Sequence, residues 1–156
     1  MAELDREDLL ILMELQDDGR MSYADISRRT GIPSSTIHDR VKRLVSSGVI
    51  TKFAALIDEE RVGVGYTAII GVETGARLYR QVAEELCGID EVVEVYGSTA
   101  EFDLMIKVRA SSRKELSQHL SEIRVIEGID DIYVMSILEV FKEEHTLPLR
   151  HLIEER

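Results

Sequence analysis

The feature of the sequence that most restricts its fold is a four-residue break, Thr30-Gly31-Ile32-Pro33, between two short helical patterns. Ser22, with Asp25 three residues later, is typical of a capped helix start and predicts a helix through Arg29. A second helix is expected from the break to residues 46–48, with a core-facing stripe formed by Ile37, Val41 and Leu44. Two short helices joined by a tight Gly-containing turn, the second with a polar outer face, are typical of a helix-turn-helix.

A further helix is expected before this motif, and a strand after it. Asp5 can cap a helix whose apolar face repeats with the helical period, and Gly19 suits the left-handed position at its end. Val49–Ile57 is apolar and β-favouring, as a wing or a linking strand would be. We therefore expect a helix-turn-helix domain over residues 1–50 and a linking strand and hinge over residues 51–64.

The second part of the chain alternates strand and helix patterns in the order βαββαβ. Strands are expected at Tyr66–Thr74, Glu91–Tyr96, Phe102–Val108 and Ile129–Phe141. Helices are expected at Leu78–Leu86 and Ser111–Ile126. The order predicts an α+β fold, in which a winged helix-turn-helix domain is followed by a ferredoxin-like domain over residues 65–142 and a tail over residues 143–156. Helices would cover one face of the sheet, so we expect the bare face to pair with a second subunit.

Composition and motif content exclude several other classes of protein. Hydrophobic residues make up 44% of the chain, yet no apolar run approaches the roughly 18 residues of a membrane-spanning helix. The acidic N-terminus lacks a secretion-signal pattern, so a cytosolic location is expected. Cys87 is the single cysteine, which excludes an intrachain disulfide, and we expect a small buried side chain there. His119, within a helix pattern, is expected at the surface or at an interface. No metal-spaced His pair, phosphate-binding loop or nucleophile motif is present, so no metal, cofactor or catalytic site is expected.

Charge is divided unevenly along the sequence. The whole chain carries a net charge of −11, which taken alone argues against a nucleic-acid partner. Residues 23–52, however, contain six Lys and Arg side chains against two Asp, a net of +4. The acidic second part would repel DNA, so we expect two copies of the basic surface to act together as a dimer on a palindromic site, with strongly salt-dependent affinity.

The outer face of the second motif helix supplies the candidate DNA contacts. Short hydroxyls fit close to base edges, and Arg binds guanine in a bidentate manner, so base contacts are expected from Ser35, Thr36, Asp39 and Arg43. Lys42 and Lys52 are expected to contact phosphate. Arg40 lies beside the core stripe, where DNA contact and a bracing role in the fold both stay open. His38 is more typical of a surface side chain than of a contact, although it lies among the candidates.

The residue pattern of the whole chain resembles the Lrp/AsnC (feast/famine) transcription regulators. In the first part the resemblance rests on Leu4-Asp5, Asp8, Ile11-Leu12, Leu15, Gly19-Arg20, Gly31, Arg40-Val41, Leu44 and Gly48-Val49-Ile50. In the second part it rests on Thr99, Glu101-Phe102-Asp103, Lys142 and Thr146-Leu147-Pro148-Leu149, which are similar to the family's RAM effector domain. The resemblance implies double-stranded DNA binding by homodimers that assemble into larger rings, often octamers, under control of an amino acid or related small molecule.

The resemblance also implies an effector site between RAM domains of neighbouring protomers. Carried over to this chain, its residues are Thr99, Ala100, Glu101, Asp103 and Ser136. A carboxylate such as Asp103 can pair with an α-ammonium group, and loop N–H groups can hold an α-carboxylate. Ala100 stands where the family usually has Gly, and Ser136 where it usually has Thr. The alternative is that Glu101 and Asp103 only mark a turn and the start of a strand. Pro33 replaces the family's usual Ser, which is expected to shift helix capping to Ser34.

Two other functions compete with a DNA-binding regulator. Sirohaem decarboxylases resemble Lrp/AsnC proteins, so an enzyme on the same scaffold is the first alternative. Such an enzyme would need His or Arg residues facing a macrocycle and would not need the cationic helix. A pure oligomerisation or ligand-sensing module is the second alternative, but it leaves the +4 segment without a purpose.

Overall fold

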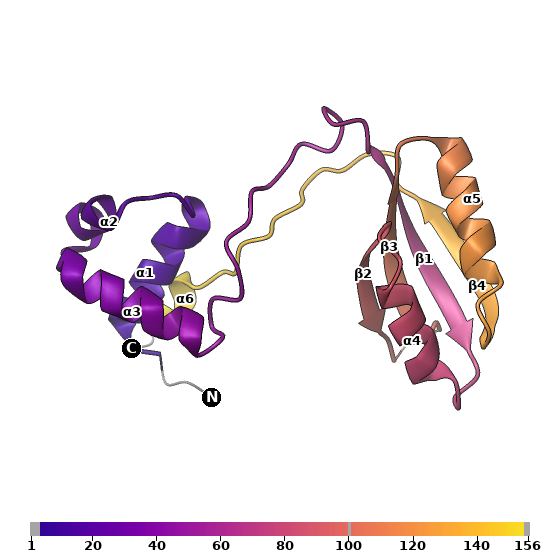
Figure 1. Ribbon diagram of the computed structural model, residues 1–156, viewed down its shortest axis with the longest axis horizontal. Helices are drawn as coiled ribbons and strands as arrows, with labels where there is room; N and C mark the ends of the chain where they lie inside the picture. Colours follow the sequence, from indigo (N-terminus) through magenta and orange to yellow (C-terminus); the bar gives the residue numbers. More distant parts are fainter. Residues whose placement is uncertain (1–3, 100, 155–156) are drawn as a thin grey trace. The chain divides into compact units, whose positions relative to one another are not determined.

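The structure is a computed structural model that describes residues 4–99 and 101–154, and the chain folds into two compact units (Figure 1). Unit 1 combines the described residues of 1–56 with those of 142–156, and unit 2 is Ile57–Phe141. The chain therefore leaves unit 1 after the helix-turn-helix and returns to it at the C-terminal end. Within the described residues, none of the helices has both the length and the apolar character needed to cross a membrane.

Unit 1 contains the expected helix-turn-helix. Its helices are α1 (Arg6–Asp17), α2 (Tyr23–Thr30), α3 (Ser34–Ser46) and the short α6 (Arg150–Glu154). Gly31, with φ of 77°, takes the left-handed conformation that closes α2 and lets α3 start three residues later. The apolar faces of α1, α2 and α3 meet in one core, whose buried members are Ile11, Ile26, Ile32, Ile37 and Val41.

Three local predictions in this unit are wrong. Gly19 is not left-handed, because α1 ends earlier, at the extended residue Asp18. Ser34 does not cap α3, since the cap position is Pro33 and the Ser34 hydroxyl instead donates to the Tyr23 carbonyl at 3.4 Å. No strand forms over residues 51–58, because a strand needs a hydrogen-bonded neighbour and the described structure places none beside this segment.

The C-terminal tail is part of unit 1. The side-chain amide of Gln16, on α1, is bonded twice to the backbone of Leu147. Gln16 Nε2 donates to the Leu147 carbonyl at 3.2 Å, and the Leu147 N–H donates to Gln16 Oε1 at 2.8 Å. Beyond this pair, α6 packs against α1. A five-residue helix has no periodic pattern to read, which is why the sequence predicts only a tail here.

A buried carboxylate joins α1 to α3. Asp5 caps α1, accepting the Asp8 N–H at 2.9 Å, while Asp8 Oδ2 accepts the Asp5 N–H at 3.1 Å. Asp8 is fully buried, and its Oδ1 accepts Arg40 Nη1 at 2.9 Å and Arg43 Nη2 at 2.5 Å from α3. Arg40 also contacts Asp5 Oδ2 at 2.7 Å and Glu7 Oε2 at 2.5 Å. The Asp8 side chain thus completes the capping box that Asp5 begins, and it holds two guanidinium groups of α3.

Unit 2 has the expected βαββαβ order. Its strands are β1 (Tyr66–Thr74), β2 (Val92–Gly97), β3 (Leu104–Ala110) and β4 (Ile129–Ser136), and its helices are α4 (Tyr79–Cys87) and α5 (Arg113–Arg124). The strands form one antiparallel sheet in the order β2-β3-β1-β4. The last strand ends at Ser136 rather than at Phe141, because its pairing with β1 ends there.

The two faces of this sheet differ. Helices α4 and α5 cover one face of the sheet (Figure 1). Residues of β1 and β3 on that face, such as Ile70, Val72, Ile106 and Val108, are buried in its core. The strand register puts the alternate residues on the opposite face, which we call the bare sheet face. It carries Ile69, Tyr96, Met105, Lys107, Tyr133 and Met135. Tyr96 and Tyr133 are more than half exposed there. The sheet therefore has the bare face that the sequence predicts.

Two predicted environments in unit 2 are reversed. Cys87 is exposed rather than buried, because it is the last residue of α4. His119 is buried rather than at the surface, since it follows Leu116 by one helical turn on the core side of α5. The buried imidazole lies 3.6–4.0 Å from carboxylate oxygens of Glu91, Glu115 and Glu122.

The first prediction concerns the anchor between Gln16 and the tail. Gln16→Ala removes both hydrogen bonds, so amide exchange at Leu147 should accelerate about 2- to 12-fold, the effect of one modest hydrogen bond. Gln16→Glu keeps the acceptor for the Leu147 N–H and should retain most of the protection. Gln118→Ala, which removes an exposed bond to Glu122 in unit 2, is the matched control. Unchanged protection at Leu147 in Gln16→Ala would refute the anchor.

The second prediction concerns acid stability. Burial opposes the charge of Asp8, but hydrogen bonds from Arg43, from the Asp5 N–H and from Arg40 outweigh it, and the pKa of Asp8 lies below its ordinary 3.8. A lowered carboxylate pKa gives stability that is present above the ordinary pKa and is lost as the pH falls through the folded-state pKa.

Asp8→Asn should therefore lower the free energy of unfolding of unit 1 by roughly 2–3 kcal/mol at pH 7, below the cost of breaking a fully buried pair because Arg43 is half exposed. The deficit should shrink as the pH falls below about 4. Urea unfolding, read from NMR signals of unit 1 at several pH values, measures both effects. Asp17→Asn, which removes an exposed carboxylate of the same helix, is the control. A deficit that is constant across this pH range would contradict the assignment.

Candidate nucleic-acid interface and effector loop

Helix α3 presents a polar face directly opposite its buried stripe. Ile37, Val41 and Leu44 are buried in unit 1. At 100° per residue, the opposite side carries Ser35, Asp39, Lys42 and Ser46, all exposed, and we call these four residues the groove face. Thr36 and Arg43 lie on the flank toward α1, where Thr36 is partly buried. This arrangement leaves short hydroxyls and one lysine accessible along the helix.

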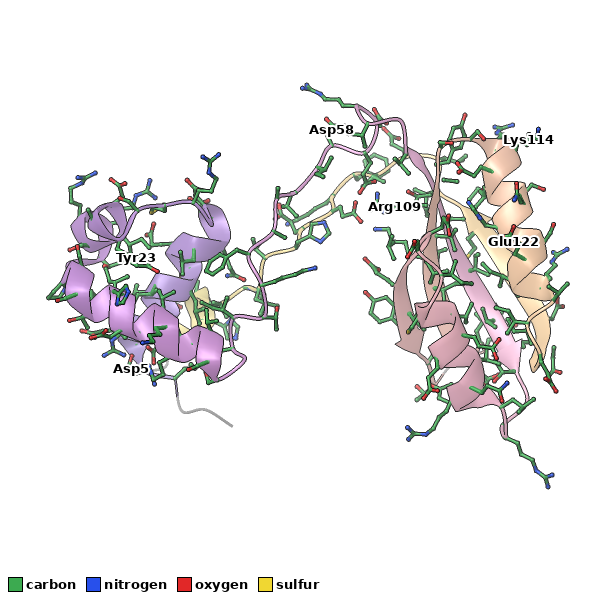
Figure 2. All side chains as sticks on the ribbon, viewed as in Figure 1. Asp5, Tyr23, Asp58, Arg109, Lys114 and Glu122 are labelled. Atoms are coloured by element: carbon green, nitrogen blue, oxygen red, sulfur yellow. The ribbon has the colours of Figure 1, made fainter. Side chains whose placement is uncertain are left out.

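His38 lies on the other flank, toward α2. Its ring packs edge-on against the ring of Tyr23, with centroids 5.9 Å apart (Figure 2). Its Nδ1 is 3.3 Å from Asp39 Oδ1, and the side chain remains 61% exposed. His38 is therefore exposed, with its ring at the edge of the groove face, a position that fits both a surface side chain and a DNA contact.

Most cations of the +4 segment are paired with carboxylates. Arg28 bonds to Asp25, and Arg29 Nη1 lies 3.0 Å from Glu14 Oε2 of α1. The Ser22 hydroxyl and the two arginines outweigh partial burial, so the pKa of Asp25 lies below its ordinary value. Together with Arg40 and Arg43, four of the six cations have acidic partners. Across residues 4–99 and 101–154, Lys42 and Lys52 form no ion pair.

The structure separates the roles of Arg40 and Arg43. The Arg40 side chain is 21% exposed and contacts three carboxylates. Its hydrogen bond to Asp5 and, less strongly, its contacts with Asp8 raise its pKa above the ordinary value, although burial acts in the opposite direction. This favours the bracing role over DNA contact for Arg40. Arg43 is 49% exposed and has a single carboxylate partner, Asp8, in the described structure. Arg43 therefore remains accessible, although it is not free.

The loop between β2 and β3 holds most of the candidate effector residues. Thr99 and Glu101 are exposed there, and Ala100 lies outside the described residues. Asp103 has a structural task, because its Oδ2 accepts the Thr74 N–H at 2.8 Å and its backbone bonds to Val72 and Ser98. Within one chain, Asp103 therefore stabilises the end of the loop and the start of β3, as in the alternative where it only marks a turn and a strand start.

Ser136 does not join this loop within one chain. Ser136 pairs with Ala68 on β1, whereas Leu104, which follows the loop, pairs with Val72. Four residues along a strand separate these positions by about 13 Å. Within one chain the strand register, which the sequence does not give, therefore places Ser136 at the other end of the sheet, so Ser136 could join the loop residues only in a site shared between protomers.

Phe102, which the sequence marks only as part of the family resemblance and not as a site residue, fastens the loop to the bare sheet face. The Phe102 ring lies over Gly71 and packs against Tyr133, with ring centroids 5.3 Å apart. A Cβ on Gly71 would come within 2.5 Å of the Phe102 ring, so only glycine leaves room for it. The signal was a glycine in the middle of a strand pattern, which often marks a close approach by another group. Loop and bare face are thus in direct contact.

Comparisons with known proteins cover both units. A family described as winged helix-turn-helix DNA-binding matches residues 4–51, and one described as Lrp/AsnC ligand binding domain matches residues 67–147. The HTH-type transcriptional regulator FL11 of Pyrococcus furiosus is 40% identical over 147 residues, which cover 94% of this chain and 97% of that protein. Its namesake in Pyrococcus abyssi is 37% identical over 149 residues, which cover 96% and 99%.

Solved structures of transcriptional regulators have the same fold as this chain. A transcriptional regulator of Neisseria meningitidis in complex with L-Met superimposes with a TM-score of 0.89 and 29% identity, covering 96% of this chain and 99% of that chain. AsnC of E. coli gives a TM-score of 0.85 with 27% identity, covering 92% and 98%. These similarities support a DNA-binding transcriptional regulator over the sirohaem-decarboxylase-like alternative. Because the matching families and relatives span both units, the chain belongs to the Lrp/AsnC family of transcriptional regulators.

Proposed function

We propose that this regulator binds a palindromic operator as a homodimer or a larger ring, with α3 in the major groove and an amino acid as effector. The observation that carries the proposal is the groove face of α3, where Ser35, Asp39 and Lys42 are accessible while the opposite stripe is buried. A helix with its apolar side fixed in a core and its polar side open has the form that enters a major groove.

The contacts divide by chemistry. We assign base-edge contacts to Ser35, Thr36, Asp39 and Arg43, and phosphate contacts to Lys42 and Lys52. Ser34 and His38 lie at the borders of this surface, and Arg40 braces the fold instead. Four of the six Lys and Arg side chains in residues 23–52 are paired with carboxylates of the same chain. A single copy of unit 1 therefore offers few phosphate contacts, and DNA affinity should rise most when two copies bind together.

The bare sheet face is our candidate for the dimer contact. It exposes Tyr96, Tyr133 and Met135 beside partly buried Ile69 and Met105, and such contiguous apolar surface is typical of an interaction site. A two-fold pair would present two copies of α3, and half-sites about 34 Å apart would follow.

The effector proposal rests on a site made by more than one chain. Thr99, Ala100, Glu101 and Asp103 belong to one loop, and Ser136 lies at the far end of the same sheet, so a neighbouring protomer must supply it. Acidic side chains can pair with an α-ammonium group and loop N–H groups with an α-carboxylate. The Neisseria relative was solved with L-Met, which supports an amino acid as the ligand class.

The third prediction tests the function directly. Random duplex DNA is selected on the full chain at low salt, with and without pooled amino acids. A two-fold symmetric sequence should be enriched, its affinity should fall steeply as salt rises, and a subset of amino acids should change the affinity. Failure to enrich any duplex at low salt would overturn the regulator proposal. Enrichment that no amino acid alters would leave DNA binding standing and remove the effector.

The fourth prediction tests the dimer contact. Tyr133→Asp places a charge on the bare sheet face, where the side chain is 54% exposed in the single chain, so the fold should survive while the dimer dissociation constant rises at least about 10-fold. Light scattering after gel filtration measures the mass. Val125→Asp, at an 81% exposed position after α5, is the matched control and should leave the mass unchanged. An unchanged mass for Tyr133→Asp would exclude this face.

A further inference from the structure

Asp8 is a buried, ionised group with no place in the DNA contacts assigned above. Its own helix fixes it, since Oδ2 accepts the Asp5 N–H at 3.1 Å and its own N–H bonds to Asp5 Oδ1 at 2.9 Å. The remaining oxygen, Oδ1, accepts a guanidinium N–H from each of two α3 residues. A carboxylate held this firmly defines where its arginine partners lie.

Its two partners are not equivalent. Arg40 touches Asp5, Glu7 and Asp8, and it is mostly covered, so it compensates the buried charge. Arg43 touches Asp8 through Nη2 alone, and half of its side chain is open to solvent. A guanidinium has five N–H donors in a rigid planar fork. When one end of the fork is fixed, the direction of the other donors is fixed as well.

We propose that Asp8 is a positioning residue for sequence reading, which holds Arg43 by one end so that its free donors face the major groove in one orientation. The inference rests on the proposed function, in particular on base contact by Arg43. Because Arg40 also pairs with the Asp8 carboxylate, this carboxylate keeps a cationic partner when the Arg43 side chain moves to contact a base. An arginine oriented before binding loses less conformational entropy when it meets guanine, and it is less available to stray phosphates.

This role predicts a loss of specificity rather than a uniform loss of affinity. In Asp8→Asn the amide offers one neutral acceptor in place of a carboxylate, so Arg43 becomes mobile. The ratio of affinities for the selected operator and a scrambled duplex should fall about 5- to 150-fold, the range of one bidentate base contact. The salt dependence for the scrambled duplex should steepen by about 0.9 in the log–log slope, because the released arginine reaches one more phosphate.

The experiment uses the full chain and the operator recovered by selection. Dissociation constants for operator and scrambled duplex are measured across a salt series for wild type, Asp8→Asn, Arg43→Ala and the double variant. Arg43→Ala should lower the ratio by itself, and adding Asp8→Asn to it should lower the ratio no further. Asp5→Asn is the matched control, because Asn caps helices as well as Asp does and the removed charge faces Arg40 only. Its ratio should stay within about 2-fold of wild type.

The outcomes separate the possibilities. If Asp8→Asn leaves the ratio of operator to scrambled-duplex affinity unchanged, the proposal is overturned. It is also overturned if Asp8→Asn lowers this ratio as much in the Arg43→Ala background as in wild type, because Asp8 would then act through the stability of the fold and not through Arg43. If Asp8→Asn does not fold, Arg43→Lys decides, since lysine keeps the charge but lacks the fork. Arg43→Lys should lower the ratio of operator to scrambled-duplex affinity while preserving binding to the scrambled duplex. If this ratio is unchanged in Arg43→Lys, the proposal is overturned. A wild-type chain that enriches no duplex would instead defeat the proposed function itself.

Discussion

The orientation of α3 depends on a carboxylate that no solvent reaches. The apolar core of unit 1, with Ile11, Ile26 and Ile37, brings the helices together but tolerates small rotations, because burial of apolar surface has little directionality. The hydrogen bonds of Asp8 are directional, and they join the first turn of α1 to the later turns of α3. The buried stripe of α3 therefore sets which side of the helix faces the core, and the hydrogen bonds of Asp8 add a directional constraint on its rotation.

The same contacts change how the charge of the chain is understood. A stretch with a net charge of +4 indicates attraction to DNA. In the structure, however, most of its arginine side chains form ion pairs with carboxylates of α1 and α2. What remains for phosphate is chiefly Lys42 and Lys52. In the proposed complex, one subunit would therefore have weak affinity for arbitrary DNA, and selectivity would come from two subunits acting together on a symmetric site.

Local sequence patterns predicted the helices and strands, but they did not predict contacts between residues that lie far apart in the sequence. The stripe of Ile37, Val41 and Leu44 and the turn at Gly31 identified the helix-turn-helix, because both signals lie within a few residues of each other. The partners of Asp8 are 32 and 35 residues away, and the partner of Gln16 is 131 residues away. No periodicity marks such pairs. The separation of Ser136 from the loop within one chain could not be predicted for a related reason, since strand register depends on which residues of β1 the strand faces.

The return of the tail to α1 has a consequence for how the protein is made. Unit 1 is discontinuous in sequence, with its first part before Ile57 and its last part after Phe141. A ribosome therefore releases the helix-turn-helix long before the segment that bonds to Gln16 has been synthesised. In the nascent chain the surface of α1 that α6 later covers stays open to chaperones and to neighbouring chains.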